Sequence, residues 1–347
     1  MSRTASCTID LAAEGKSSGY IQIGDSTNTS GWANHCIPII SIKNGAGPRL
    51  LLLAGNHGDE YEGQIVATDL SRRLETSEIL GQVIIIPCLS QEASQNGNRL
   101  WNNGANFNRI FPGNEDGTIN EKLAFFLSND LFPTCDVIVD MHSGGRSMAF
   151  IPSSNMVWLS DLALRKVMLA NMLAWNTEYH MIGGEQPSTN PHSLLPGDVV
   201  RQGKSLSTGE FGGCGWSTAE TVKIIRDGLH DFMRALGVLN GEYKTRAERG
   251  LPEAKILDFL EGDAYVTAPC DGIYENCANL EDEVSAGDLV GKVHDFNHSD
   301  RKPIPVYAGR SGVIGMVRGY PPVRTGDVVC TIGILHENIA NFEAVRY

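Results

Sequence analysis

The segment Ala54–Gly63, Ala-Gly-Asn-His-Gly-Asp-Glu-Tyr-Glu-Gly, places a histidine three residues before a glutamate, directly after an apolar run. Where a strand turns into a helix, His57 and Glu60 can point at the same place, and imidazole and carboxylate groups are good zinc ligands. The alternative is a polar turn in which Asp59 or Glu60 only caps the following helix. By itself this segment leaves both interpretations open.

A second segment, Val137–Gly145, is an apolar run that ends in Asp-Met-His-Ser-Gly-Gly. Asp140 and His142 are two residues apart, so on a strand they share a face. A carboxylate beside a ligating imidazole can hydrogen-bond its second nitrogen, although a core histidine satisfied by an aspartate would look the same. Together with His57 and Glu60, His142 completes the three-ligand set typical of catalytic zinc, which leaves one position for water. We therefore expect one Zn²⁺ per chain.

Two further segments carry polar groups suited to a substrate. The loop Arg99–Gly113 is rich in asparagine and glycine and holds Arg99 and Arg109, and arginine binds carboxylates through its planar fork. Ser207–Gly213 places Glu210 among glycines, where a backbone can approach a ligand closely. A zinc hydrolase with three protein ligands needs a separate carboxylate to accept the proton of water, and Glu210 is the best candidate. A solvated loop arginine and a surface turn glutamate are the alternatives.

The elements that must position these residues follow from the apolar pattern. Short apolar runs separated by helical stretches indicate an α/β fold with a parallel or mixed sheet covered by helices on both faces. The stretch 180–207 is rich in Gly, Pro, Asn and Ser and is expected to form extended loops with short strands. The expected strands are 38–42, 50–54, 83–87 and 137–141, and the expected helices are 65–74, 121–131, 158–175 and 219–236.

The sequence changes character within residues 240–252, where we place a domain boundary. We expect a catalytic domain over 1–245, with an N-terminal extension at 1–36, and a β-rich domain over 246–347. Beyond the boundary, Val266–Ile273 recurs as Val306–Val313, and Val284–Val290 recurs as Val323–Val329. Two copies of strand, glycine turn and strand predict a small all-β unit that resembles the barrel-sandwich hybrid of biotinyl and lipoyl carrier domains.

Composition excludes several classes of function. The 347 residues include 28 basic and 41 acidic side chains, a net charge of −13, which disfavours nucleic-acid and membrane-surface binding. Eight scattered cysteines without a C-x-x-C pair indicate free thiols. The N-terminal residues do not have the pattern of a signal peptide, and no stretch reaches the about 18 apolar residues of a membrane helix. We expect a cytoplasmic protein.

The four polar segments, in this order, resemble the succinylglutamate desuccinylase/aspartoacylase family, a branch of the zinc carboxypeptidase fold. The matching forms are Gly-x-His-Gly-x-Glu, Asn-x-Asn-Arg-x-Phe-Pro-Gly, Asp-x-His-Ser-Gly and Glu-x-Gly-Gly. The resemblance implies a zinc-carboxypeptidase-like mixed sheet flanked by helices. Residue by residue it implies zinc on His57, Glu60 and His142, substrate carboxylate binding by Asn108 and Arg109, Glu210 as general acid/base, and Arg99 on the scissile carbonyl. From its spacing on the strand, Asp140 is expected behind the ligand His142.

The implied activity is hydrolysis of the amide bond of a small anionic or zwitterionic N-acyl amino acid by metal-activated water. Known substrates in the family include N-acetylaspartate, N-succinylglutamate and N-acetyl-2,4-diaminobutyrate, and the length and C-terminal repeat most resemble the diaminobutyrate deacetylase group. Two alternatives stay open: a metallocarboxypeptidase acting on short peptides, and a non-catalytic carrier or binding protein modified at Lys302. His294 and His298 are expected in a solvated turn. A homo-oligomer is compatible with all of these.

Overall fold

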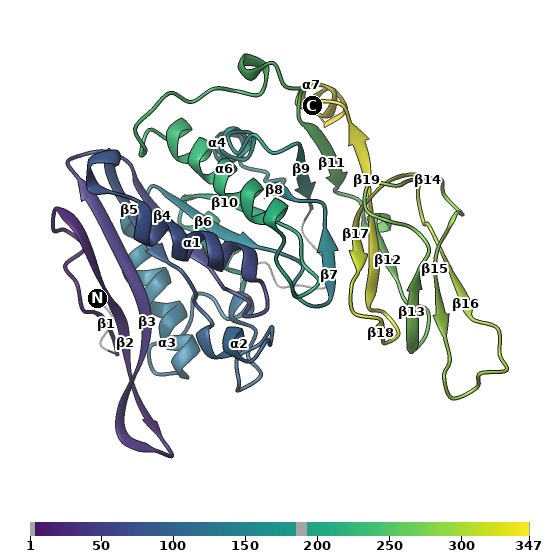
Figure 1. The fold of residues 1–347 in the computed structure, drawn as a ribbon, viewed down its shortest axis with the longest axis horizontal. Coiled ribbons are helices and arrows are strands. Elements are labelled where there is room, and N and C mark those ends of the chain that lie inside the picture. Colours follow the sequence, from purple (N-terminus) through teal and green to yellow (C-terminus); the bar gives the residue numbers. More distant parts are fainter. Residues whose placement is uncertain (1–3, 185–192, 347) are drawn as a thin grey trace.

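The computed structural model describes residues 4–184 and 193–346. Its largest feature is a mixed sheet in the order β1-β2-β3-β5-β4-β6-β10-β8-β9-β11-β19-β17-β14, which runs across the width of the molecule in Figure 1. The strands of the catalytic half are β1 (Ala5–Cys7), β2 (Gly15–Thr27), β3 (Ser30–Asn44), β4 (Arg49–Ala54), β5 (Gly81–Ile86), β6 (Val137–His142), β7 (Met148–Phe150), β8 (Ser153–Val157), β9 (Tyr179–Gly183) and β10 (Ser205–Glu210).

The centre of this sheet is parallel. β4 pairs in parallel with β5 and with β6, and β6 pairs in parallel with β10. Every residue of β5 and β6 is buried, as expected for strands covered on both faces. Successive residues of β4 enter opposite cores, because Leu51 and Leu53 join one hydrophobic cluster and Leu50 and Leu52 the other.

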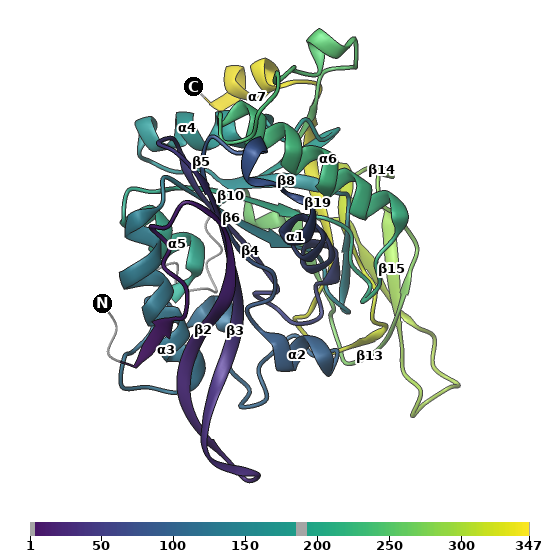
Figure 2. The same cartoon turned by 60° about the vertical axis from the view of Figure 1, so that its left-hand side comes forward.

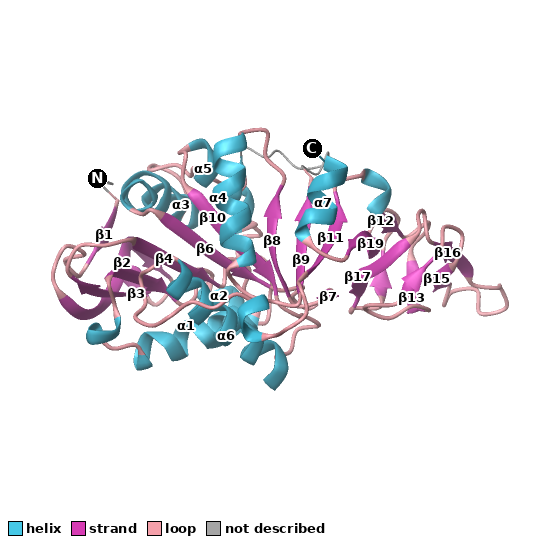
Figure 3. Ribbon diagram, turned by 90° about the horizontal axis from the view of Figure 1, so that it is seen from above, coloured by secondary structure: helices cyan, strands magenta, loops and turns pink. Residues whose placement is uncertain are grey.

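Helices cover the two faces separately, as the view from above shows (Figure 3). The cluster around Leu51 is covered by α3, α4, α5 and α7, and the cluster around Leu50 by α1 and α6. The short α2 lies on the side of α1 and α6 in the same view. The helices are α1 (Tyr61–Arg73), α2 (Gln91–Gln95), α3 (Ile119–Phe126), α4 (Leu162–Leu173), α5 (Leu195–Arg201), α6 (Ala219–Ala235) and α7 (Ile339–Arg346).

The C-terminal part is all-β except for short helical turns and α7, as the repeat predicted. β13, β15, β16 and β18 form a separate antiparallel sheet, which stands apart from the helices in Figure 1. β11 pairs in parallel with β9, so the large sheet continues past the expected boundary, which itself stays a prediction. The strands are β11 (Lys255–Phe259), β12 (Tyr265–Thr267), β13 (Gly272–Asn276), β14 (Glu283–Val284), β15 (Leu289–His294), β16 (Ile304–Tyr307), β17 (Gly312–Arg318), β18 (Pro322–Val323) and β19 (Val328–His336).

The mixed sheet flanked by helices is confirmed, and all four expected strands and four expected helices are present with shifted ends. One shift has a local cause: α4 begins after Asp161, whose side chain accepts hydrogen bonds from the backbone N–H groups of Ala163 and Leu164. The expected helix 121–131 is divided, since α3 gives way to a π-helical turn at Leu127–Leu131.

The prediction for 180–207 was wrong in one respect, while residues 185–192 of it lie outside the described part. Leu195–Arg201 forms helix α5, with Pro196 in its first turn, where the missing N–H costs nothing. Leu195 and Val199 enter the hydrophobic core, so burial outweighs the local Gly/Pro signal. All eight cysteines are free. No helix in residues 4–184 and 193–346 combines the length and apolarity required to cross a bilayer.

Candidate active site

The predicted site residues follow three neighbouring parallel strands at the point where each strand ends. β4 ends at Ala54, three residues before His57, β6 ends at His142, and β10 ends at Glu210. In the pairing of β6 with β10, Glu210 lies directly beside His142. Carboxyl ends of parallel strands meet at one edge of a sheet, which is where α/β proteins place their ligands. The sheet therefore brings together segments far apart in the sequence.

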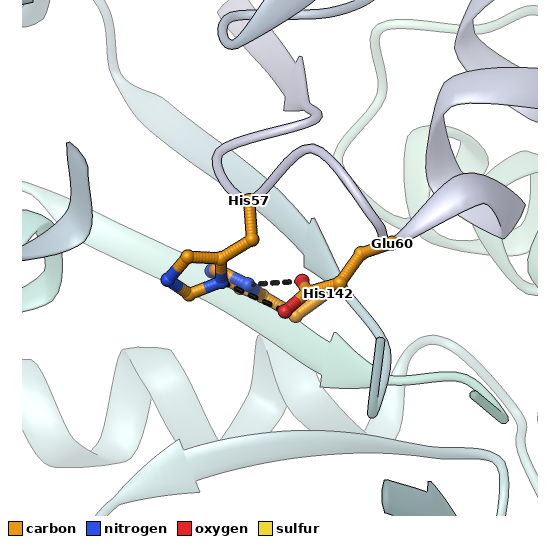
Figure 4. A group of neighbouring side chains, drawn as sticks. All are labelled: His57, Glu60 and His142. Carbon is orange, nitrogen blue, oxygen red and sulfur yellow. Dashed lines mark hydrogen bonds and ion pairs between the residues drawn. The ribbon is translucent and has the colours of Figure 1, made fainter. Parts of the chain in front are cut away.

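His57, Glu60 and His142 converge in a buried cluster (Figure 4). His57 Nδ1 lies 2.7 Å from Glu60 Oε1, and His142 Nδ1 lies 2.8 Å from Glu60 Oε2. One ligand atom from each of the three residues lies within 4.8 Å of the others. Glu60 stands at the N-cap of α1 but makes no capping hydrogen bond, so the helix-cap alternative does not account for its side chain.

The outer nitrogen of each histidine also has a partner. His142 Nε2 lies 2.8 Å from Asp140 Oδ2, which in turn accepts a hydrogen bond from Asn56 Nδ2 at 2.8 Å. His57 Nε2 lies 3.1 Å from Asn106 Oδ1. With a proton on each Nε2, both Nδ1 lone pairs face Glu60, and this is how outer acceptors prepare histidines as metal ligands.

The pKa values of the three side chains are shifted differently by their surroundings. Burial would raise the pKa of Glu60, but the charges of His57 and His142 outweigh it and leave that pKa well below its ordinary value. Burial lowers the pKa of His57. Burial acts in the same direction on His142, yet the carboxylates of Asp140 and Glu60 raise the pKa of this imidazole well above its ordinary value. Two carboxylates, Asp140 and Glu60, thus favour positive charge at His142, which lies between them.

These residues fit a zinc ion. Two imidazole nitrogens and one carboxylate are the donor set of many catalytic zinc sites, and all three side chains are nearly inaccessible to solvent. Protons on the two Nε2 atoms leave the nitrogens that face the centre free to coordinate. The sequence-predicted ligands are therefore brought together, and their assignment to zinc stays a proposal.

The two arginines of the loop 99–113 reach the same region. Arg99 Nη1 donates to Glu60 Oε1 at 2.8 Å. Burial, followed by the charge of Arg99, lowers the pKa of Arg109, so the two guanidinium groups lie near each other. Asn108 Oδ1 accepts the backbone N–H of Leu195 at 3.2 Å, which leaves the amide Nδ2 as the group that can donate to a ligand. The loop thus offers several donors beside the histidine cluster.

Glu210 is partly exposed, yet its Oε2 atom is buried and has no hydrogen-bond partner among the described residues. Burial, with the nearby charge of Glu60, raises the pKa of Glu210 to about 8. The turn after it is anchored to the site, because Phe211 N donates to His142 O at 3.0 Å and Gly213 N donates to Glu62 Oε1 at 3.1 Å. A carboxyl group that can hold or release a proton near neutral pH suits acid–base chemistry.

Sequence reasoning gave no role to Asn56, Glu62 or Asn106. Asn56 directly precedes His57, and Asn106 begins the Asn-x-Asn-Arg motif, so their positions were visible signals. Their partners were not visible, since the hydrogen bonds join residues 84 and 49 positions apart. Glu62 lies on the first turn of α1 and is buried at 1% exposure, which its charge alone would not predict.

Comparison with known proteins agrees with this geometry. Residues 46–236 match the succinylglutamate desuccinylase/aspartoacylase catalytic domain. The chain belongs to this family. It is 33% identical over 335 residues, 96% of both chains, to N-alpha-acetyl-L-2,4-diaminobutyric acid deacetylase of Halomonas elongata.

Solved structures of family members superpose closely. The product-bound structure of the ectoine utilization protein EutE (DoeB) from Ruegeria pomeroyi has a TM-score of 0.90 at 32% identity, covering 96% of this chain and 100% of that one. A succinylglutamate desuccinylase/aspartoacylase from Rhodobacter sphaeroides has a TM-score of 0.89 at 36% identity, covering 96% and 99%. The resemblance therefore extends over nearly the whole chain, including the C-terminal sheet.

The remaining predicted residues lie in the C-terminal part. His294 ends β15, and His298 follows in a turn, each paired with one exposed carboxylate, Glu275 and Asp295 respectively. Lys302 is exposed between β15 and β16, immediately before Pro303. The structure thus brings together the seven metal- and substrate-related residues of the catalytic half with Asp140, and leaves these three outside.

Proposed function

We propose that this protein is a zinc-dependent amidohydrolase that removes the acyl group from a small N-acyl amino acid. The observation that carries the proposal is the buried convergence of His57, Glu60 and His142, with Glu210 beside His142 on the neighbouring strand. Membership of the family supports it, and so does the deacetylase named among its relatives.

His57, Glu60 and His142 would hold the zinc ion, which when bound would supply a Lewis acid that favours deprotonation of water and polarises an acyl carbonyl. Glu210 accepts the proton of the attacking water at its carboxylate and later delivers it to the leaving amine. Asp140 and Asn106 hold the two imidazoles with their Nδ1 atoms inward. Arg99 stabilises negative charge as it develops on the acyl oxygen.

Arg109 and the Nδ2 group of Asn108 anchor the substrate carboxylate. The guanidinium of Arg109 makes one hydrogen bond among the described residues, to Asn108 O at 3.4 Å, and its remaining N–H groups have no partner in that part of the chain. An acidic chain of net charge −13 needs such fixed cationic groups to retain an anionic substrate. A substrate of the N-acetyl-diaminobutyrate type fits the named relative best, ahead of N-acetylaspartate and N-succinylglutamate. A cytoplasmic location remains a prediction.

A metallocarboxypeptidase acting on short peptides is the second candidate, because it needs the same three ligands and an arginine for the terminal carboxylate. Parallel assays with N-acyl amino acids and with dipeptides of the same C-terminal residue separate the two activities. We expect hydrolysis of the N-acyl amino acids to dominate. Biotin or lipoate found on Lys302 by mass spectrometry of the purified chain would instead revive the carrier alternative.

The decisive experiment compares Glu210→Gln with wild type on a panel of N-acyl amino acids, in zinc-loaded and chelator-stripped form. Loss of a general base costs about 10²–10⁴-fold in rate, so Glu210→Gln should lower kcat by that amount while zinc content stays unchanged. Glu253→Gln, an exposed carboxylate outside the site, is the matched control. Undiminished activity in Glu210→Gln or in the stripped wild type contradicts the proposal.

A further inference from the structure

A second buried carboxylate lies in the first turn of α1, beside the proposed metal ligands. It belongs to Glu62, which is 1% exposed and follows Glu60 by two residues. In Figures 1 and 2 α1 lies beside α6, and it packs against β4 and β6. The helix begins close to the sheet, because a Cβ atom at Gly63 would lie 2.7 Å from Met141 Cβ. Burial of a carboxylate is costly unless its oxygens have partners, so the partners of Glu62 show what it holds.

Glu62 contacts the turn that follows Glu210. Its Oε1 atom accepts the backbone N–H of Gly213 at 3.1 Å. A Cβ atom at Gly212 would lie 3.0 Å from the same oxygen, so the carboxylate lies directly against the two glycines. Glu62 therefore joins the start of α1, which follows Glu60, to the end of β10, which carries Glu210.

The turn of residues 211–213 has few other means of being fixed to α1. Gly212 and Gly213 have φ values of +96° and +136°, which glycine adopts without steric cost, and neither has a side chain that could pack against the helix. The backbone partners of this turn lie in the segment 142–150, at the end of β6 and in β7. Among the described residues, Glu62 is the one side chain that hydrogen-bonds to the backbone of the turn.

The position of Glu210 relative to the proposed ligands depends on both elements. Strand pairing places Glu210 beside His142, but Glu60 stands at the start of α1, which strand pairing does not fix. The hydrogen bond from Gly213 to Glu62 fixes the turn after Glu210 to this helix. A general base must lie within hydrogen-bond reach of the proton that it accepts, and a displacement of about 1 Å can cost about 100-fold in rate.

We propose that Glu62 is a positioning residue, which holds Glu210 at the distance from the metal ligands that proton transfer from water requires. The inference rests on the proposed function, since Glu62 has this task only if Glu210 is the base. The hydrogen bond to Gly213 requires an oxygen acceptor and no negative charge. Glutamine, whose amide oxygen accepts the same bond, should therefore replace Glu62, and alanine should not.

The kinetic test compares Glu62→Ala and Glu62→Gln with a control, Asp69→Ala. Asp69 is another buried carboxylate of α1, in the second half of the helix, where it pairs with Arg73 and Arg226. Glu62→Ala should lower kcat about 10–100-fold, and KM should stay unchanged because Arg109 and its loop are untouched. Glu62→Gln should keep a kcat close to that of wild type. Asp69→Ala should lower the melting temperature but not kcat.

Two further measurements do not depend on activity. Hydrogen exchange, followed by mass spectrometry, should be faster in the peptide of residues 205–216 of Glu62→Ala, because that variant frees the Gly213 N–H. The same peptide should exchange as in wild type in Glu62→Gln and in Asp69→Ala. Zinc content, measured by elemental analysis, should equal that of wild type in all three variants. If Glu62→Ala does not fold, Glu62→Met takes its place, because methionine fills a similar space and offers no oxygen acceptor.

A double variant separates this inference from the proposed function. If Glu62 acts through Glu210, Glu62→Ala should lower kcat no further in the Glu210→Gln background. The positioning role is overturned by unchanged kcat in Glu62→Ala, by loss of zinc in that variant, by an equal fall of kcat in Glu62→Gln, or by full additivity in the double variant. Wild-type activity in Glu210→Gln alone overturns the proposed function instead, whatever Glu62→Ala shows.

Discussion

Two of the histidine–carboxylate pairs in this molecule have nearly the same nitrogen–oxygen distance and very different surroundings. At the edge of the large sheet, His142 Nδ1 lies 2.8 Å from Glu60, and in the C-terminal sheet His294 Nε2 lies 2.7 Å from Glu275. The side chains of the first pair are 9% and 2% exposed, while those of the second are 38% and 45% exposed. Distance therefore does not distinguish the two pairs, but burial does.

The surroundings of the two histidines differ as well. Both nitrogens of His142 face a carboxylate, Glu60 on one side and Asp140 on the other, and His57 approaches the same Glu60. His294 faces one carboxylate beside water, where an ion pair is worth little. A metal site requires several ligands that are already oriented and desolvated, and only the pair at the large sheet meets that requirement.

The substitution with the largest expected effect breaks the buried pair of His142 and Glu60. Glu60→Gln removes a proposed ligand and the negative charge between two imidazoles, so zinc should be lost. Because changes to residues that only hydrogen-bond to a ligand cost up to about 100-fold, loss of a ligand itself should lower kcat/KM by more than about 100-fold. Zinc content is measured by elemental analysis after loading and dialysis. Glu275→Gln makes the same chemical change in the exposed pair and should alter neither quantity. A comparable loss of zinc in both variants would show that burial does not separate the pairs.

Arg109→Gln tests whether substrate binding and metal binding are separate within the buried site. The guanidinium makes no hydrogen bond to the three proposed ligands among the described residues, so zinc content should stay at the wild-type level. Hydrogen bonds to a charged group contribute about 1.5–3 kcal/mol, so KM should rise about 10–100-fold with a smaller change in kcat. Steady-state kinetics measures both. A drop in zinc content as large as the rise in KM would assign Arg109 to the metal site instead.

Asp140 and Asn106, which face the Nε2 atoms of His142 and His57, can be compared for their effect on zinc affinity. Asp140 is charged and Asn106 is neutral, and a charged acceptor makes the stronger hydrogen bond to an imidazole. Asp140→Asn should therefore lower zinc affinity by about tenfold or somewhat more, and Asn106→Leu by only a few-fold. Competition with a chelating dye gives both affinities. The reverse order would mean that His57, not His142, depends more on its outer partner.

Much of this site could be predicted from the sequence because its residues follow apolar runs. His57, His142 and Glu210 each come at or just after the end of a strand, and parallel strands bring their ends together whatever their separation in the chain. The position of Arg99 was harder to predict, since a long loop has no periodicity. The structure places its guanidinium 2.8 Å from Glu60.

The partners of Asn56, Glu62 and Asn106 could not be predicted for a different reason. Each makes a hydrogen bond whose existence depends on the packing of two segments, not on either segment alone. Helix α5 was missed because its Gly and Pro favour a loop locally, while the burial of Leu195 and Val199 stabilises the helix in the fold. Tertiary burial is the common factor, and it is also what separates His142 from His294.

The smallest expected effect is on the pH dependence of stability, and it concerns a buried histidine away from the site. His180 on β9 is fully buried, and its Nδ1 lies 2.7 Å from Ser154 Oγ and 3.2 Å from Thr177 Oγ1. Both hydroxyls donate to backbone carbonyls of Met172 and Tyr179, so Nδ1 must carry the proton and donate. Nε2 is buried and has no partner in the described part of the chain. A second proton there would be an unpaired buried charge.

Burial lowers the pKa of His180 from 6.5 to about 3, with the charge of Arg246 acting in the same direction. Between these values the unfolded chain binds a proton that the folded chain does not, so the stabilising contribution is complete above pH 6.5 and is lost as the pH falls. Wild type should lose about 1 kcal/mol more than His180→Asn between about pH 7.5 and pH 5.5 in urea unfolding. The asparagine keeps an N–H donor near Nδ1 and cannot take up the proton. If His180→Asn kept the full pH dependence of wild type, proton uptake by the buried His180 would not be the cause of that dependence.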